Sequence, residues 1–416
     1  MKIIKKALAG AVLTATAVTA QAGNVEVLHY WTSGGEAQAL SVLKGMLEKE
    51  GHSWTDFAVS GGGGETAMTV LKARAISGNP PSASMIAGPE IQQWSELGVL
   101  ANIDQVADKE GWDKLLPKNV ANIHKSEGHY VAAPVNVHRI NWMWLNKSIL
   151  DEVNSGQVPA DWDQFFAFLD KAKAAGYTAF AHGGQDWQDA TVFEQVALGV
   201  GGADWYNKAF VELDQEALKS DTMVTAMTKF KRLRNYMDTG MPGRDWNLST
   251  AMVIEGKAAV QIMGDWVKGE FSAAGKKPGV DYVCAAVPGT DNAFSFNVDA
   301  FMMFNKSGDD AKAQQTLARL LMSREFQEEF NLKKGSIPVR PDVSYDRYDS
   351  CAKLSRDDFN KSSGAGSLVP SFAHAMAMQP QVSGAVYDVV TNYFNDSSKT
   401  AESATKELAA AIKAAQ

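Results

Sequence analysis

Apolar residues recur along the chain at two spacings, one typical of helices and one typical of buried strands. In the segment after residue 36, Leu40, Leu43 and Leu47 fall on one face of a helix. The same spacing predicts helices over residues 37–50, 65–77, 89–97, 162–175, 191–198, 222–238, 385–395 and 401–415. Short runs rich in strand-forming residues predict strands over residues 25–31, 136–146, 258–263 and 300–304. Strands and helices in alternation predict the α/β fold class.

The chain beyond residue 22 is too long for one compact core, so we expect two domains. A hairpin-like stretch over residues 128–134 ends at Pro134, which fixes the next turn. The strand over residues 136–146 then enters a second lobe, and the run 300–304 returns the chain to the first. We predict an N-terminal lobe of residues 23–134 plus 298–344 and a C-terminal lobe of residues 135–297 plus 345–416.

Residues 1–22 have the pattern of an export signal. Three lysines precede residue 7, residues 7–18 form an apolar run too short to span a bilayer, and Ala20-Gln21-Ala22 fits a cleavage site. We predict cleavage after Ala22, the alternative being a buried N-terminal helix. Loss of the three lysines takes the formal net charge from −8 to −11, which disfavours nucleic acid and anionic membranes as partners.

The exported part holds both cysteines of the chain, Cys284 and Cys351. Two thiols in an oxidising compartment favour a disulfide, although two separate buried thiols remain the alternative. Two cysteines without a histidine cluster or an HExxH motif do not make the usual zinc site. We therefore predict no metal and no cofactor.

Aromatic, carboxylate and amide side chains gather in predicted loops. The first strand ends on Tyr30 and Trp31, and Glu36 opens the helix that follows. Similar groups recur in the loops 182–189, 243–247 and 264–266. A sugar ring packs its apolar C–H face on an indole and bonds carboxylates through its hydroxyls. A single tryptophan of this kind is more often a half-buried core residue, but the repetition favours a sugar site.

Four glycines, Gly61–Gly64, precede the helix that starts at Glu65. Bare amides at a helix start can cradle a phosphate, but the segment lacks the Gly-Lys-Ser/Thr ending and the GxGxxG spacing of nucleotide sites. We expect instead a loop that lets the backbone approach a ligand.

Several motifs occur in an order that resembles the periplasmic glucose-binding proteins of ABC importers. They are HYWTSGGE, GGGGETAMTVLKARAISGNPPSASMIAGPEIQQW, PVNVHRINWMWLN, AHGGQDWQDATVFE, GRDWN, GDWVKGEF, FNVDAF, KKGSIPVR and AHAMA. The resemblance spans nearly the whole mature chain. It implies a type II periplasmic binding protein fold, with two α/β lobes joined by hinge strands and the ligand cleft between them. It also implies a monomeric, non-enzymatic receptor in the periplasm that passes a monosaccharide, first of all glucose, to a membrane permease.

The same resemblance assigns roles to residues by position. It implies that Trp31 stacks on the sugar ring and that the second lobe contributes a wall of Trp246 and Trp266. It also implies four side chains that bond hydroxyls, namely Glu36, Asp299, Lys334 and His374. From composition alone, Lys334 would be a solvated helix-end lysine and His374 a core histidine. Cys284 and Cys351 correspond to the family's cystine.

Two positions depart from the family pattern. Ala87 stands where a lysine is expected, and Tyr30 stands where a second tryptophan is common. Losing a charge-assisted donor from a pocket costs about 1.5–3 kcal/mol unless another group replaces it. An alanine also makes room for a bulkier sugar, so mannose, galactose or a glucoside are alternatives to glucose.

Two other classes of protein fit some of these residues. In an exported carbohydrate-active enzyme, Glu36 and Asp299 would serve as an acid and nucleophile pair. A receptor for an amino acid or peptide would need an arginine to clamp the ligand carboxylate, for which Arg139 and Arg244 are candidates. The many tryptophans favour a sugar over these ligands.

Overall fold

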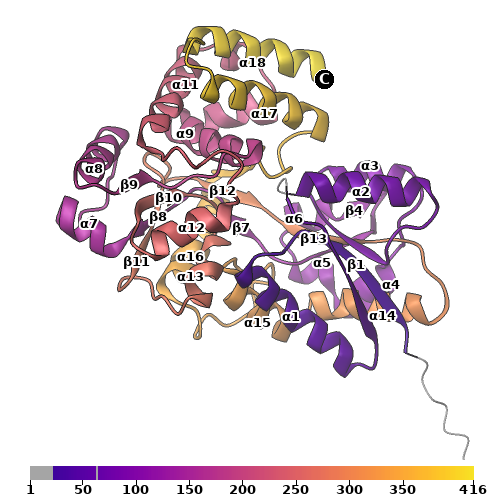
Figure 1. Ribbon diagram of the computed structural model, residues 1–416. Helices are drawn as coiled ribbons and strands as arrows, with labels where there is room; N and C mark the ends of the chain where they lie inside the picture. Colours follow the sequence, from indigo (N-terminus) through magenta and orange to yellow (C-terminus); the bar gives the residue numbers. More distant parts are fainter. Residues whose placement is uncertain (1–21, 62–63) are drawn as a thin grey trace, which may run out of the picture.

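The computed structural model of the protein describes residues 22–61 and 64–416, which form two lobes (Figure 1). The predicted export signal, except for Ala22, lies outside the described residues, as do Gly62 and Gly63 of the glycine run. The prediction of an export signal is therefore not addressed by the structure.

The first lobe is built on a five-stranded sheet in the order β2-β1-β3-β13-β6. Its strands are β1 (Asn24–His29), β2 (Ser53–Ala58), β3 (Ala83–Ala87), β6 (Ala132–Pro134) and β13 (Asp299–Met303). Strand β1 is parallel to β2 and β3, whereas β13 is antiparallel to β3 and β6. The register places Asp299 directly opposite Ala87. The carboxyl ends of β1 and β3 therefore lie beside the start of β13.

Helices cover both faces of this sheet (Figure 1). They include α1 (Gly34–Lys49), α2 (Glu65–Ile76), α3 (Glu90–Glu96), α14 (Gly308–Leu321) and α15 (Arg324–Lys334). Val25 and Val27 of β1 point to the core shared with α1 and α14, and Leu28 points to the core shared with α2 and α3. This burial of both faces explains why the central strands β3 and β13 are largely apolar, whereas the edge strand β2 is polar and exposed. Smaller elements complete the lobe: α4 (Asp104–Glu110), α5 (Trp112–Leu115), α6 (Lys118–Ile123), β4 (Lys125–Ser126) and β5 (His129–Tyr130).

The second lobe contains a four-stranded sheet in the order β11-β8-β10-β9. Its strands are β8 (Trp142–Asn146), β9 (Thr178–Phe180), β10 (Ala258–Ile262) and β11 (Tyr282–Ala286). Its helices are α7 (Lys147–Asn154), α8 (Trp162–Ala174), α9 (Asp186–Tyr206), the π-helix η2 (Asn207–Val211), α10 (Gln215–Leu218), α11 (Asp221–Leu233), the 3-10 helix η3 (Arg234–Tyr236), α12 (Trp246–Ile254), α13 (Val267–Ala273), α16 (Ser350–Ala365), α17 (Pro380–Asn395) and α18 (Ala401–Ala415). Helices α9, α11, α17 and α18 pack together at the top of Figure 1.

A third, three-stranded sheet lies where the chain passes between the lobes. Its order is β14 (Leu368–Pro370), β12 (Phe294–Asn297) and β7 (His138–Arg139). Only Val298 separates β12 from β13, so the chain passes directly from this sheet into the sheet of the first lobe. The site residues on β7, β12 and β13 are consequently held by regular backbone hydrogen bonds.

The prediction of one strand over residues 136–146 was wrong. The segment forms two strands, β7 and β8, which belong to different sheets. Between them, the buried Asn141 side chain donates to the Ala293 carbonyl at 3.1 Å and accepts the Ser295 N–H at 3.2 Å. These long-range bonds, which the local sequence does not encode, hold the backbone in a turn at this point.

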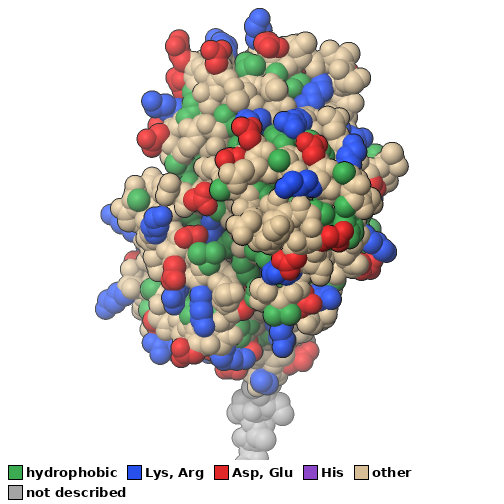
Figure 2. All heavy atoms as spheres, turned by 90° about the vertical axis from the view of Figure 1, so that its left-hand side faces the viewer, with side chains coloured by type: hydrophobic (Ala, Val, Ile, Leu, Met, Phe, Trp, Pro, Cys, Tyr) green, Lys and Arg blue, Asp and Glu red, His purple; other side chains and the backbone are tan. Residues whose placement is uncertain are grey.

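The predicted disulfide is present between Cys284 of β11 and Cys351 of α16, whose Cα atoms lie 6.1 Å apart. Within residues 22–61 and 64–416, none of the helices combines the length and apolar character needed to cross a membrane. Figure 2 shows acidic and basic side chains interspersed over the face that carries α7 and α8.

Candidate ligand-binding cleft

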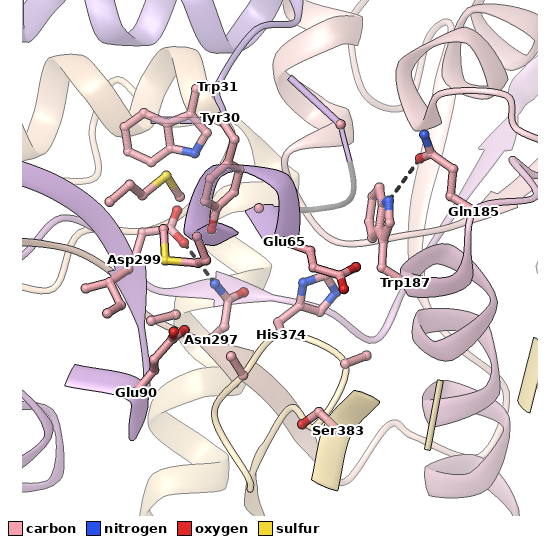
Figure 3. Close-up of a pocket in the computed structure, with 18 of the residues that line it drawn as sticks. Tyr30, Trp31, Glu65, Glu90, Gln185, Trp187, Asn297, Asp299, His374 and Ser383 are labelled. Atoms are coloured by element: carbon pink, nitrogen blue, oxygen red, sulfur yellow. Dashed lines mark hydrogen bonds between the residues drawn. The ribbon is translucent and has the colours of Figure 1, made fainter. Parts of the chain in front are cut away.

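A cavity of about 680 Å³ lies between the lobes and is lined by residues of both. All seven residues that the sequence nominated line it: Trp31, Glu36, Trp246, Trp266, Asp299, Lys334 and His374. Figure 3 shows Asp299 and Glu90 on one side, Trp187 and Gln185 on the other, and His374 between them. The structure therefore brings together side chains that lie more than 300 residues apart in the sequence.

The first polar group in the cavity is a buried ion pair between α1 and α15. Lys334 Nζ lies 2.8 Å from Glu36 Oε1, and both side chains are at most one-tenth exposed. The other Glu36 oxygen accepts the N–H groups of Thr32 and Ser33 at 3.1 and 3.2 Å. Ser33 in turn caps α1, so the carboxylate is fixed by the helix start itself. Lys334 has two further N–H donors available to a ligand.

The second polar group is a buried chain of three ionisable side chains. His138 Nε2 lies 2.9 Å from Asp299 Oδ2, and His138 Nδ1 is in short contact with Asp265 Oδ1. Burial alone lowers the pKa of His138, but the two carboxylates raise it to about 9. Burial raises the pKa of Asp299, but the charges of His138 and Lys334 outweigh this and hold it below the usual value. Asp299 is therefore ionised at neutral pH.

The indoles contribute unequally to the cavity. Trp31 is only 2% exposed, because its ring packs against Phe301 and Phe330 with centroid distances of 5.6 and 5.3 Å. It reaches the cavity with a small part of its surface. Trp266 is 7% exposed and lies perpendicular to the half-buried Trp246, at 6.5 Å between ring centroids. The second lobe thus offers a wall of two indoles to the cavity.

His374 lies on the segment between β14 and α17. Its Nε2 lies 3.0 Å from the Thr191 hydroxyl, and its ring lies 4.9 Å from that of Trp266. Burial and the nearby His138 charge lower its pKa to about 3, so the ring is neutral at pH 7. At Gly88, on the opposite lobe, an added Cβ would lie 1.8 Å from the Ala375 carbonyl oxygen. Only glycine allows the lobes to approach this closely here.

A buried glutamate of α9 anchors the backbone of this segment. Glu194 accepts hydrogen bonds from the Ser371 hydroxyl at 2.7 Å and from the Phe372 N–H at 2.6 Å. Burial raises the pKa of its carboxyl to about 7, although the donors around it oppose the shift. The anchor fixes the start of the segment that carries His374.

Two loops that the sequence singled out separately meet at the cavity. Gln185 donates to Asp245 at 2.8 Å and accepts the Trp187 indole N–H at 2.9 Å. Trp187 and Gln185 line the cavity but were not among the nominated site residues, and neither were His138, Glu90 and Asn297. The two loop residues had a sequence signal, since they fall in the segment 182–189. A lone histidine or glutamate within a strand or helix pattern gave none.

Ala87, one of the two departures from the family pattern, lies in the wall of the cavity. It lines the cavity together with Lys72 and Glu90, whose Nζ and Oε1 atoms lie 3.8 Å apart. Tyr30 also lines the cavity. Lys72 thus places a cation beside this part of the cavity. Lys72 belongs to α2, and its side chain is largely exposed.

The two arginines considered as carboxylate clamps lie elsewhere. Arg139 is fully buried and bonds Asp358 at 2.7 Å, and Arg244 bonds Asp238 at 2.8 Å. None of the described residues that line the cavity is an arginine. Likewise, the part of the chain that the structure describes contains no group of three His, Cys, Asp or Glu side chains suited to a metal. Neither of the two arginines is placed to clamp a ligand carboxylate in this cavity.

Known proteins resemble this chain along nearly its whole length. A probable sugar-binding periplasmic protein from Brucella suis is 52% identical over 393 residues, covering 94% of this chain and 93% of the relative. A protein of the same description from Rhizobium meliloti is 49% identical over 410 residues, covering 99% of this chain and 98% of the relative. The family model described as bacterial extracellular solute-binding protein matches residues 34–322.

Solved structures share the fold at lower identity. A chitin oligosaccharide binding protein has a TM-score of 0.79 at 16% identity, covering 95% of this chain and 99% of that protein. The solute receptor AcbH, described as preferring β-D-galactopyranose, has a TM-score of 0.77 at 17% identity, covering 94% and 99%. The predicted type II periplasmic binding fold is confirmed. By sequence and by fold, the chain belongs to the bacterial extracellular solute-binding protein family and is a solute-binding protein, not an enzyme.

Proposed function

We propose that this chain is a periplasmic receptor that binds a sugar between its lobes and delivers it to the permease of an ABC importer. The observation that carries the proposal is the composition of the cavity: carboxylates and a lysine on one side, indoles on the other. Sugars need both kinds of group at once. The relatives described as sugar-binding periplasmic proteins support the same ligand class.

Within this proposal, the first lobe supplies most of the hydrogen bonds and the second lobe most of the stacking. Asp299 and Glu36 accept sugar hydroxyls, Lys334 donates to them, and Trp266 with Trp246 packs on the C–H face of the ring. Trp31 contributes a smaller contact because its indole is nearly enclosed. His374 is neutral and offers a ring that both donates and accepts.

We propose D-glucose as the first candidate ligand. The finer assignment depends on whether Lys72, or water, compensates for the missing lysine at Ala87. Lys72 supports compensation because it borders the same part of the cavity. If it does not reach the ligand, the space beside Ala87 favours mannose, galactose or a glucoside.

Binding and closure are coupled in this account. Contacts from both lobes exist together only in the closed form, so a sugar shifts the open–closed equilibrium by its differential affinity. The lobes already touch through Gln93 and Gln379, whose side chains lie 2.7 Å apart. The lobe boundaries at residues 134, 297 and 344, cleavage after Ala22, and the monomeric state stay predictions.

Isothermal titration of the ligand-stripped mature protein tests the proposal. The sugars are D-glucose, mannose, galactose and maltose. We expect one-to-one binding of D-glucose with a dissociation constant in the micromolar range or below, about −8 kcal/mol or stronger. Asp299→Asn should weaken this binding, whereas Asp108→Asn, at an exposed position on α4, should not.

Each other outcome has a defined meaning. Heat with another sugar alone would overturn the assignment to glucose but keep the sugar receptor. No heat with any of the four sugars would contradict a receptor for these sugars. Equal sugar affinity of the wild type and Asp299→Asn would show that the sugar does not bind at Asp299, at the start of β13.

A further inference from the structure

His138 occupies an unusual place, buried between two carboxylates that come from different parts of the fold. Asp299 begins β13 in the sheet of the first lobe, and Asp265 follows β10 in the second lobe. The side chains of His138, Asp265 and Asp299 are 2%, 2% and 4% exposed. Charged groups this deeply buried are retained only where they are paired and hydrogen-bonded.

Counting protons defines the state of the ring. A neutral imidazole carries one N–H, yet both ring nitrogens of His138 face carboxylate oxygens. An imidazolium that donates from both nitrogens satisfies both carboxylate contacts at once. The raised pKa of His138, about 9, agrees with this state at neutral pH.

The neighbouring Asn136 is compatible with the imidazolium. Its Oδ1 accepts the Asp299 N–H at 3.2 Å, which fixes the orientation of the amide. Its Nδ2 lies 2.9 Å from His138 Nε2, but also donates to Asp299 Oδ2 at 3.2 Å and to the Ser336 hydroxyl at 3.1 Å. The amide is thus satisfied without an acceptor on the ring.

The other charged groups near His138 are engaged elsewhere. Lys334 acts on Asp299 but is paired with Glu36, and Arg139 is paired with Asp358. Arg139 contributes its backbone N–H to the second oxygen of Asp265 at 2.9 Å. His374 is neutral at pH 7. His138 is therefore the cation that directly neutralises both Asp265 and Asp299.

The bonds to Asp299 leave room for a ligand. A carboxylate offers about four lone-pair sites. His138 and Asn136 occupy Oδ2, and Asn297 donates to Oδ1 at 3.0 Å (Figure 3). One site on Oδ1 remains for a hydroxyl from the cavity. On the other side of the ring, Asp265 directly precedes Trp266, whose indole lies perpendicular to His138 at 5.2 Å.

We propose that His138 is a positioning residue for ligand binding, an imidazolium that orients the acceptor Asp299 and ties it to the Asp265–Trp266 turn of the opposite lobe. Because His138 joins Asp265 to Asp299, the alignment of the two sides of the cavity depends on the proton that gives the His138 ring its charge. Loss of that proton leaves Asp265 and Asp299 buried with too little positive charge, and the two sides separate. The inference rests on the proposed function, since it concerns the same ligand site.

The first test follows sugar affinity against pH in the wild type and in His138→Gln. In the wild type, affinity should stay level from about pH 6 to pH 8 and fall at least tenfold as the pH rises through about 9. In His138→Gln, affinity at pH 7 should be about tenfold weaker, and the fall centred near pH 9 should disappear. His129→Gln, at an exposed position, should keep the wild-type profile.

A second measurement tests the inference without sugar binding, for the case that His138→Gln does not fold or that the sugar does not bind. Nitrogen-15 NMR of the wild-type histidine rings should show an imidazolium signal that titrates near pH 9. This signal should be absent from His138→Gln. A neutral His138 ring at pH 7 overturns the inference whatever the sugar result. Sugar binding with an unchanged pH profile in His138→Gln overturns it too, while leaving the proposed function intact.

Discussion

At the scale of single residues, we expect the ion pair between Lys334 and Glu36 to contribute to the stability of the fold. Lys334→Met should lower the free energy of unfolding by about 3–5 kcal/mol, because it leaves a buried carboxylate without its cation. The methionine keeps most of the apolar stem, so the loss reports the charge. Chemical denaturation followed by circular dichroism measures it, and sugar binding should weaken in the same variant.

The neighbouring residue supplies the control. Lys333 is exposed on the last turn of the same helix, so Lys333→Met should change stability by less than about 0.5 kcal/mol. A Lys334→Met variant as stable as Lys333→Met would show that Glu36 does not depend on the pair. The hydrogen bonds to Thr32 and Ser33 would then be enough to hold it.

Site residues were predictable where a side chain suited to binding a sugar lies next to the end or the start of a predicted strand. Glu36 and Trp31 follow a strand, and Asp299 precedes an apolar run, so each had a local signal. His138 had none, because a lone histidine next to an arginine in an apolar stretch is typical of a core residue. Its partner Asp265 lies 127 residues away, and only the fold brings the two together. The enclosure of Trp31 by Phe301 and Phe330 was hidden for the same reason.

At the scale of elements, eight helices were predicted from a regular apolar spacing, whereas others with a buried apolar face, such as α7 and α14, were missed. The eight predicted helices are all present, and α18 begins and ends at the predicted residues. Strands were less predictable, because their pairing depends on distant partners. The segment 136–146 mixes polar and apolar residues without a turn signal, and the bonds of Asn141 to residues 293 and 295 lie where it divides.

The disulfide is an element-scale constraint with a measurable contribution. It joins β11 to α16 and closes a loop of 67 residues. Replacing both cysteines by serine should lower the free energy of unfolding by about 4 kcal/mol, chiefly because the unfolded chain gains freedom. Equilibrium denaturation of the oxidised wild type and the double variant gives the difference.

Reduction provides an independent check on the same quantity. The wild type treated with a thiol reductant should unfold like the double serine variant. If reduction leaves the unfolding midpoint unchanged, the bridge does not constrain the unfolded chain as expected. Sugar affinity should persist in the double variant, since neither cysteine lines the cavity.

At the scale of the whole molecule, the cavity is a product of chain topology. Its lining comes from many separate parts of the chain, from Tyr30 near the start of the described residues to Tyr387 on α17. The sequence indicated two lobes and a sugar-like set of groups, but it could not show which loops meet. The meeting of segments 182–189 and 243–247 with the segment before α17 follows from helix packing across the second lobe.

The central claim is that a sugar lies between the two lobes and contacts both. A crystal structure of the protein grown with D-glucose tests it most directly. We predict one sugar in the cavity, with a hydroxyl on Asp299, another on Lys334, and a C–H face against Trp266 or Trp246. A sugar bound outside this cavity would contradict the account, whereas a cavity that stays empty at saturating D-glucose would overturn only the assignment to glucose.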